Sequence, residues 1–282
     1  MLDYDIIKIA KDVKAYLNQD FSQGLLDFVL ASRSNDFKRD DFKLIKDNKG
    51  HEVFNFTYQN KEYYLKNYSQ QGLKKDLKNL VRPVEAIRYF KISCGLLAES
   101  IPVVKPALAV EFRVNMLRKD SLFLTEGVAA SNLYDFLLKD EVSQKFKEQA
   151  VKESAFLFAQ LYQNNFHPGD PNLENILITD KQQELILVDV DNIKRYPLLP
   201  KILVLRNLAK FNALAYKNNE NWNQNYREIF LSNCLKRLDF KQEIAESIAR
   251  VDDLTVKRLI NWDRKHIIKA NPLLLDKFKQ NK

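Results

Sequence analysis

The stretch that decides the fold is Phe166-His167-Pro168-Gly169-Asp170-Pro171-Asn172-Leu173-Glu174-Asn175-Ile176-Leu177-Ile178. It begins as a polar loop that presents Asp170, because Gly, Pro and Asn favour turns. Asn175 follows five residues later, and an apolar strand begins directly after it. A second apolar run, residues 185–188, ends at Asp189. The pattern predicts a β-hairpin whose two ends carry Asn175 and Asp189 side by side.

These side chains suit phosphoryl transfer. Mg²⁺ bound to nucleotide phosphates takes few protein ligands, all of them oxygens. In such sites one Asp accepts the proton of the acceptor hydroxyl, while an Asn and a second Asp hold the metal. The alternative is structural, since Gly-Asp and Asp-Pro-Asn are common turn sequences and Asp189-Val190-Asp191 could simply end a strand.

Two residues upstream favour the catalytic interpretation. Lys66 lies on an aromatic strand expected over residues 63–68, and Glu85 lies on a helix expected over residues 84–97. A strand lysine held by a helix glutamate would position the α- and β-phosphates of a nucleotide. Taken alone, Lys66 could instead protect a sheet edge, and Glu85 could favour a helix start. The order and spacing of all five residues together favour a nucleotide site.

The chain divides into a β-rich first half and an α-rich second half. Helical spacing of apolar residues over 5–33 predicts a helical N-terminal extension of about residues 1–40. Alternation then predicts strands, over residues 42–46, 53–58, 63–68, 107–112 and 122–125. Later helices are expected over residues 201–217, 224–250 and 254–270. We therefore expect an N-terminal lobe of residues 1–125 and a C-terminal lobe of residues 126–282, with a cleft where they meet.

Composition limits the class of protein. The 282 residues carry 45 Lys and Arg against 37 Asp and Glu, a net charge of +8. This balance favours an anionic partner, such as a nucleotide, an acidic glycan or a membrane surface, although a solvated lysine-rich surface gives the same count. No basic, aromatic nucleic-acid surface is evident. Two cysteines, Cys94 and Cys234, exclude a disulfide framework and a cysteine-based zinc module.

The sequence gives no sign of secretion or of a membrane span. The N-terminus is acidic and lacks an apolar signal region. No run approaches the roughly 18 apolar residues that cross a bilayer. We expect a cytoplasmic protein, with peripheral contact to the cytoplasmic face of the inner membrane as one prospect.

Over about residues 45–235 the chain resembles the protein-kinase-like superfamily and, within it, the Kdo/WaaP lipopolysaccharide kinase family. The catalytic-loop motif is similar to residues 170–177, and the metal motif to residues 188–191. Flanking segments that resemble those of the family are Arg82-Pro83-Val84-Glu85, the proline-containing residues 101–107, the hinge Leu124-Thr125-Glu126-Gly127 and the basic residues 206–211.

The resemblance implies a bilobal α+β kinase fold and an ATP- and Mg²⁺-dependent enzyme. The γ-phosphoryl group would pass to a sugar hydroxyl, on Kdo or heptose, of the lipopolysaccharide inner core. By the same carry-over, Asp170 is the general base and Asn175 and Asp189 are the metal ligands. The residues assigned to the nucleotide are Lys66, Glu85, Glu126 of the hinge and Gly50 of the loop over the phosphates. Gly50 is a lone glycine and is equally typical of a plain hairpin turn.

The chain departs from the family pattern in two places. Pro168 stands where the catalytic loop usually has a histidine, and His167 is one position further away. No Ala-Pro-Glu segment follows Asp191, and a helix begins soon afterwards. The short connection also suits a soluble small-molecule kinase of the aminoglycoside or choline type. A pseudokinase that only binds is the alternative outside the enzymes. Basic residues around 194–210, Lys210 among them, could face an anionic glycan or form a solvated helix face.

Overall fold

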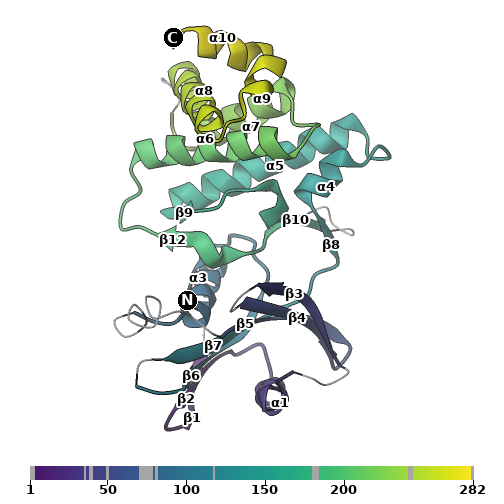
Figure 1. Ribbon diagram of the computed structural model, residues 1–282, viewed down its shortest axis with the longest axis vertical. Coiled ribbons are helices and arrows are strands. Elements are labelled where there is room, and N and C mark those ends of the chain that lie inside the picture. The colour runs from purple at the N-terminus through teal and green to yellow at the C-terminus, as the bar shows by residue number, and fades with distance from the viewer. Residues whose placement is uncertain are drawn as a thin grey trace. The chain divides into compact units, whose positions relative to one another are not determined.

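The computed structural model describes residues 4–34, 36–37, 41–48, 51–69, 79, 82–116, 118–179, 184–240 and 244–280 (Figure 1). The chain forms two compact units, Met1–Val128 and Ala129–Lys282. In the described part, no helix combines the length and the apolar character needed to cross a membrane.

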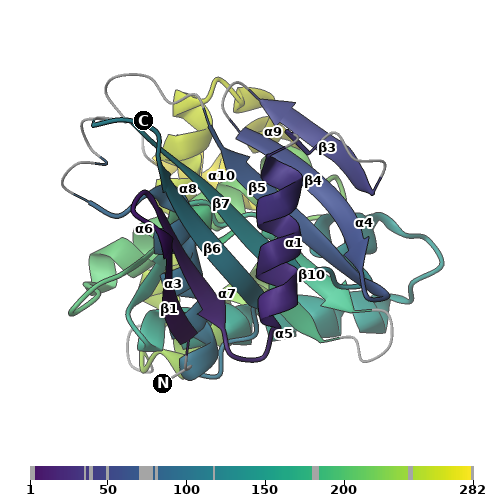
Figure 2. The ribbon, with the colours of Figure 1, turned by 90° about the horizontal axis from the view of Figure 1, so that it is seen from below.

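The first unit is built on a seven-stranded antiparallel sheet with the strand order β1-β2-β6-β7-β5-β4-β3. Its strands are β1 (Tyr4–Ala10), β2 (Val13–Asn18), β3 (Phe42–Asn48), β4 (His51–Tyr58), β5 (Lys61–Tyr68), β6 (Pro106–Arg113) and β7 (Lys119–Glu126). Helix α1 (Gln23–Arg33) lies across one face of this sheet (Figure 2). Its buried residues Leu25, Leu26 and Val29 share a core with Phe56 and Leu65.

The opposite face of the sheet is covered by α3 (Glu85–Ala98). Tyr89 of this helix contacts Tyr68 of β5 and Phe123 of β7, with ring centroids 5.7 and 6.5 Å apart. Phe90 packs against Tyr16 of β2 on the same side. The sheet is therefore apolar on both faces, with one helix over each.

The prediction of a helical N-terminal extension is wrong over residues 4–18, which form the β1–β2 hairpin. β2 pairs with β6, and Ala15, Tyr16 and Leu17 are buried within the sheet. β1 lies at the sheet edge with Ile6 and Ile9 exposed, so its apolar residues do not follow the alternation of a half-buried strand. β-branched residues fit such a strand better than a helix.

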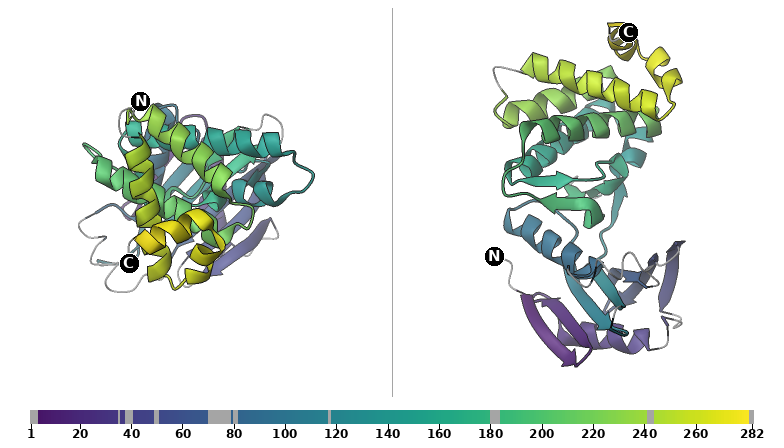
Figure 3. Two further views of the ribbon diagram at one scale, coloured as in Figure 1. Left: turned by 90° about the horizontal axis from the view of Figure 1, so that it is seen from above. Right: turned by 60° about the vertical axis from the view of Figure 1, so that its left-hand side comes forward.

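The second unit is mainly helical. Its helices are α4 (Leu133–Leu138), α5 (Gln144–Gln163), α6 (Lys201–Asn218), α7 (Gln224–Arg237), α8 (Ile244–Asn261), α9 (Lys265–Ala270) and α10 (Pro272–Gln280). Two small antiparallel sheets accompany them, one of strands β11 (Leu185–Leu187), β10 (Ile176–Thr179) and β8 (Ala130–Asn132), the other of β12 (Ile193–Arg195) and β9 (Phe166–Pro168). Figure 3 shows α6 and α8 from two further sides.

The predicted helix over residues 224–250 is wrong in its boundaries. α7 ends at Arg237, and Asp239 adopts a left-handed backbone with φ of 61°. α8 then continues through residues 251–254, where the sequence analysis placed a break. The pair Asp252-Asp253 resembles a loop in the sequence, yet Asp252 is buried inside the helical unit.

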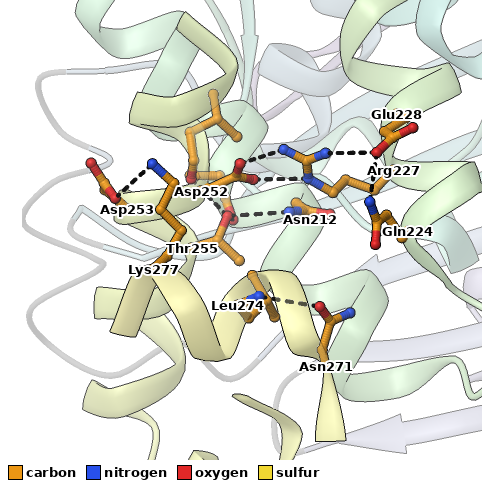
Figure 4. A network of polar contacts seen from close by, with 12 residues as sticks. Asn212, Gln224, Arg227, Glu228, Asp252, Asp253, Thr255, Asn271, Leu274 and Lys277 are labelled. Carbon is orange, nitrogen blue, oxygen red and sulfur yellow. Dashed lines mark hydrogen bonds and ion pairs between the residues drawn. The ribbon is translucent and has the colours of Figure 1, made fainter. Parts of the chain in front are cut away.

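A buried ion pair holds α7 to α8 (Figure 4). Arg227 Nε donates to Asp252 Oδ1 at 2.8 Å, a second contact joins Arg227 Nη2 to Asp252 Oδ2, and both side chains are 3% exposed. Thr255 of α8 also accepts a hydrogen bond from Asn212 of α6 at 3.3 Å. Three helices are thus joined through polar groups within an apolar core.

Each unit contains one buried free cysteine, Cys94 in α3 and Cys234 in α7. Burial raises the pKa of the Cys94 thiol to about 12 and raises that of Cys234 further still.

Candidate active site

The predicted catalytic loop connects β9 to β10 in the second unit. Asp170 lies in this loop with its side chain half exposed. The short 3-10 helix η1 (Leu173–Asn175) follows, and β10 begins at Ile176. Asn175 turns back onto the loop, because its Nδ2 donates to the carbonyl oxygen of Asp170 at 3.0 Å. The two residues are therefore fixed relative to each other by a direct contact.

Gly169 allows this loop to approach the segment after Asp189. Its backbone N–H donates to the carbonyl oxygen of Asn192 at 2.8 Å. A Cβ atom at position 169 would lie 2.6 Å from that oxygen, closer than any real contact of this kind. Only glycine fits at this position, because the backbone of Asn192 lies too close to leave room for a side chain.

The hairpin predicted from the two apolar runs is confirmed. β10 and β11 are antiparallel, with Ile176 opposite Leu187. The N–H of Val188 donates to the carbonyl oxygen of Asn175 at 3.0 Å, so the pairing continues to the end of the hairpin. Asp189 follows at once, with φ of 57° and ψ of 65°. Asp adopts this left-handed conformation more readily than most residues do. The change of backbone direction at Asp189 ends the extended segment that follows β11.

The three predicted residues line one hollow. Asp170, Asn175 and Asp189 are among the residues around a cavity of about 20 Å³. Apolar residues such as Phe158, Ile176 and Leu187 make up much of the rest of its lining. Asp191 lies in η2 (Val190–Asn192) and is not among the lining residues.

The donor set fits a magnesium ion carried by a nucleotide. Asn175 uses its Nδ2 for the Asp170 carbonyl, which leaves Oδ1 as the end available to a cation. Asp189, which lines the same hollow, supplies a carboxylate. No group of three or more His, Cys, Asp or Glu residues suited to a metal gathers among the described residues.

Helix α6 supplies residues that the sequence analysis did not assign to the site. Asn207 donates through Nδ2 to the carbonyl oxygen of Pro168 at 2.6 Å, and its Oδ1 accepts from the Tyr162 hydroxyl at 2.7 Å. One turn later, Lys210 Nζ lies 2.6 Å from the carbonyl oxygen of Gly169 and 3.2 Å from Asp170 Oδ1. The sequence analysis allowed two interpretations of Lys210, as a cation that faces an anionic glycan or as part of a solvated helix face. The chain gave no local signal for this contact, because the two residues are 40 positions apart.

His167 packs beside the loop and not at the hollow. Its ring lies 5.9 Å from that of Tyr196, and it pairs with Lys194 across β9 and β12. Burial lowers the pKa of the His167 imidazole, and the cations Lys194 and Lys210 lower it further. His167 is not among the residues that line the hollow.

Lys66 lies in β5 of the first unit. This strand is hydrogen-bonded to β4 on one side and to β7 on the other. Side chains alternate between the two faces of a strand. Leu65 belongs to the core under α1, so Lys66 points to the face covered by α3. Its neighbours there include Phe123, directly opposite in β7, and Tyr68, two positions along the strand.

Glu85 begins α3 and is 4% exposed. Arg88, three positions on, places Nη2 at 3.6 Å from its Oε1. Tyr89 follows Glu85 by four positions, so both lie on one side of the helix, and Tyr89 contacts Phe123 and Tyr68 around Lys66. The fold thus directs Lys66 and Glu85 to the same face of the sheet.

Glu126 ends β7. Its side chain accepts from Lys61 Nζ at 3.2 Å, which raises the pKa of that lysine. Its N–H donates to the carbonyl oxygen of Lys105, and the N–H of Gly127 donates to that of Glu62. Both N–H groups of this segment are therefore used within the first unit. Gly50, the remaining predicted nucleotide residue, lies outside the described residues.

Comparisons with known proteins agree with this architecture. The chain is similar to a solved structure described as WaaP in complex with acyl carrier protein, with a TM-score of 0.54 and 15% identity over 75% of this chain and 88% of that chain. The fold, with an antiparallel sheet in the first unit and mainly helices in the second, is of the α+β class of that structure, and the predicted fold class is confirmed. No curated protein matches the sequence. The model of the lipopolysaccharide kinase (Kdo/WaaP) family matches residues 35–232, and the chain belongs to that family.

Proposed function

We propose that this lipopolysaccharide kinase transfers the γ-phosphoryl group of ATP to a hydroxyl of a Kdo or heptose residue in the inner core. The observation that supports this most is the convergence of Asp170, Asn175 and Asp189 on one hollow. Their chemistry matches an in-line displacement on a metal-bound nucleotide.

In the proposed reaction, Asp170 accepts the proton of the sugar hydroxyl. The hydroxyl oxygen forms a bond to the γ-phosphorus, the bond from that phosphorus to the bridging oxygen breaks, and ADP leaves. A half-exposed carboxylate suits this role, because catalysis here is mainly positioning and charge neutralisation. Mg²⁺, when bound, would neutralise phosphate charge, with Asn175 and Asp189 as its protein ligands.

The first unit would bind the nucleotide. Lys66, directed to the α3 face, would contact the α- and β-phosphates, and Glu85 would hold its ammonium in place. Glu126 would meet the base through its carbonyl oxygen, since its N–H already donates to Lys105.

The acceptor is anionic, and the net charge of +8 suits it. We further propose peripheral contact with the cytoplasmic face of the inner membrane. Partition onto vesicles that contain anionic lipid should then be strong at low salt and lost at high salt.

The experiment that tests the function measures ATP consumption and locates the phosphate by mass spectrometry, using purified inner-core acceptors, choline and aminoglycosides. The parent should phosphorylate the core glycan, and Asp170→Asn should lower the rate by about 10²–10⁴-fold. Glu174→Gln is the matched control, because Glu174 is an exposed acid in the same loop whose contact is with Asn172. Phosphorylation of the small alcohols alone would support a small-molecule kinase, and nucleotide binding without any product would support a pseudokinase.

A further inference from the structure

Helix α6 contacts Pro168 at the end of β9 and the next two residues, Gly169 and Asp170, through side chains of different kinds. Asn207, a neutral amide, holds the carbonyl oxygen of Pro168 at 2.6 Å. Lys210, a cation, holds the carbonyl oxygen of Gly169 at 2.6 Å and Asp170 Oδ1 at 3.2 Å. Because Asn207 and Lys210 are three positions apart, they lie on one side of the helix. The hydrogen bond from Asn207 already holds the helix against this segment. Anchoring alone therefore does not require a second, charged side chain.

The ammonium of Lys210 has a donor to spare. It carries three N–H groups, and two are directed at Gly169 and Asp170. No acceptor for the third is found in the described part of the chain. The Lys210 side chain is 27% exposed, against 50% for Asp170, so the lysine is the more covered of the two but is still in part open to solvent.

The position of this charge matches the place where the proposed reaction develops negative charge. A hydroxyl bound to Asp170 lies about 2.7 Å from the carboxylate, and the phosphorus that it attacks lies about 3–3.5 Å beyond the hydroxyl oxygen. The Lys210 ammonium is 3.2 Å from the same carboxylate. A cation fixed in advance beside the reacting atoms stabilises the transition state more than the bound substrate.

We propose that Lys210 is a further catalytic residue, whose ammonium orients Asp170 and donates its remaining N–H to an oxygen of the phosphoryl group in transfer. This inference rests on the proposed function, because it needs Asp170 as the proton acceptor. No proton is taken from Lys210 in the step; it stays charged while the phosphoryl group passes to the sugar and the hydroxyl proton to Asp170.

The test separates charge from a structural tie. Lys210→Gln retains a hydrogen-bond donor for the loop but removes the charge, and Lys210→Arg keeps the charge. We expect Lys210→Gln to lower kcat by about 10²-fold, with the Kd of a fluorescent ATP analogue changed less than about threefold. The kcat of Lys210→Arg should be at least about tenfold higher than that of Lys210→Gln. Lys217→Met, an exposed lysine on the same helix over the ring of Trp262, is the matched control.

A second measurement reports on the phosphoryl contact directly. The complex of MgADP with aluminium fluoride resembles the transferring group. Lys210→Gln should weaken its binding by about as much as it lowers kcat. Unchanged binding, with kcat still lowered, would overturn the phosphoryl contact. Thermal melting checks that each variant is folded, and Lys210→Met serves if Lys210→Gln is not.

The outcomes distinguish this inference from the function on which it rests. If the parent phosphorylates the core glycan and Lys210→Gln keeps kcat within about threefold, the role of Lys210 is refuted and the kinase function stands. If the parent phosphorylates no acceptor and Asp170→Asn leaves its ATP turnover unchanged, both are refuted.

Discussion

The backbone N–H of Gly169 donates to the carbonyl oxygen of Asn192 at 2.8 Å, and this bond joins the loop that carries Asp170 to the segment that follows Asp189. Gly169→Ala would place a Cβ 2.6 Å from that oxygen and 3.1 Å from the Cβ of Asn192. We expect it to lower the free energy of unfolding by about 1–3 kcal/mol and to reduce kcat, because the two halves of the site must separate. Urea unfolding and steady-state rates measure both effects.

Gly24→Ala provides the control for this substitution. Its Cβ would lie 2.9 Å from the Tyr58 hydroxyl and 3.8 Å from Ser22 Oγ, and both atoms are the ends of side chains. Gly24 lies in the first turn of α1, and alanine is favoured over glycine in a helix by at most about 1 kcal/mol. Equal losses of stability in the two variants would contradict the role given to Gly169.

The proposed magnesium ligands, Asn175 and Asp189, predict how activity depends on the Mg²⁺ concentration. Asp189→Asn keeps the shape of the side chain but removes its charge, so we expect the Mg²⁺ concentration for half-maximal activity to rise by about tenfold or more, since each lost carboxylate weakens binding of a hard cation. Titration of activity with Mg²⁺ at fixed ATP measures it. Glu184→Gln, at the other end of the same hairpin, should leave the titration unchanged.

Lys66→Met tests the nucleotide site of the first unit. A hydrogen bond to a charged group contributes about 1.5–3 kcal/mol, so the Kd for MgATP should rise by roughly 10–100-fold. Glu85→Gln should shift it in the same direction by less. The control is Lys43→Met in β3, an exposed lysine of the same sheet. Calorimetric titration with a non-hydrolysable ATP analogue measures the three constants, and an unaltered Kd in Lys66→Met would remove Lys66 from the site.

The ion pair between α7 and α8 predicts a large loss of stability. Arg227→Met leaves Asp252 buried without its partner, which costs about 3–5 kcal/mol. Lys277→Met removes a partner 3.9 Å from the more exposed Asp253, and such surface pairs contribute at most about 1 kcal/mol. Denaturant unfolding compares them. The double variant Arg227→Met with Asp252→Leu should recover most of the loss, because no lone charge then remains buried.

His167 predicts a pH dependence of stability. Its folded-state pKa is lowered, first by burial, so the unfolded chain binds the proton more readily than the folded one. The resulting stability is present above the ordinary value of about 6.5 and is lost as the pH falls through the lower folded value. Melting temperatures of the parent and of His167→Gln, measured from about pH 7.5 down to pH 5, should converge as the pH falls. Parallel curves would show that His167 does not contribute.

Local patterns predicted the parts of the site that are local in sequence. The hairpin brings Asn175 beside Asp189 because a short antiparallel pair fixes its own ends, and the spacing alone indicated this. The contact of Lys210 with Asp170 depends on how α6 packs in the second unit, and a basic helix face in the sequence does not show where a loop lies against it. The sequence analysis did not predict edge strand β1. Its position in the sheet also depends on packing, and with Ile6 and Ile9 exposed its apolar residues do not alternate with polar ones.

The two cysteines make the stability of each unit separately measurable. Cys94 lies in the first unit and Cys234 in the second, and both are buried with raised pKa values, so neither thiol is reactive while its surroundings are folded. A thiol reagent added to the intact chain would therefore modify each cysteine only when its own unit opens. Mass spectrometry of the two labelled peptides then gives two opening rates from one unmodified sequence, and shows whether a nucleotide or a glycan protects one unit or both.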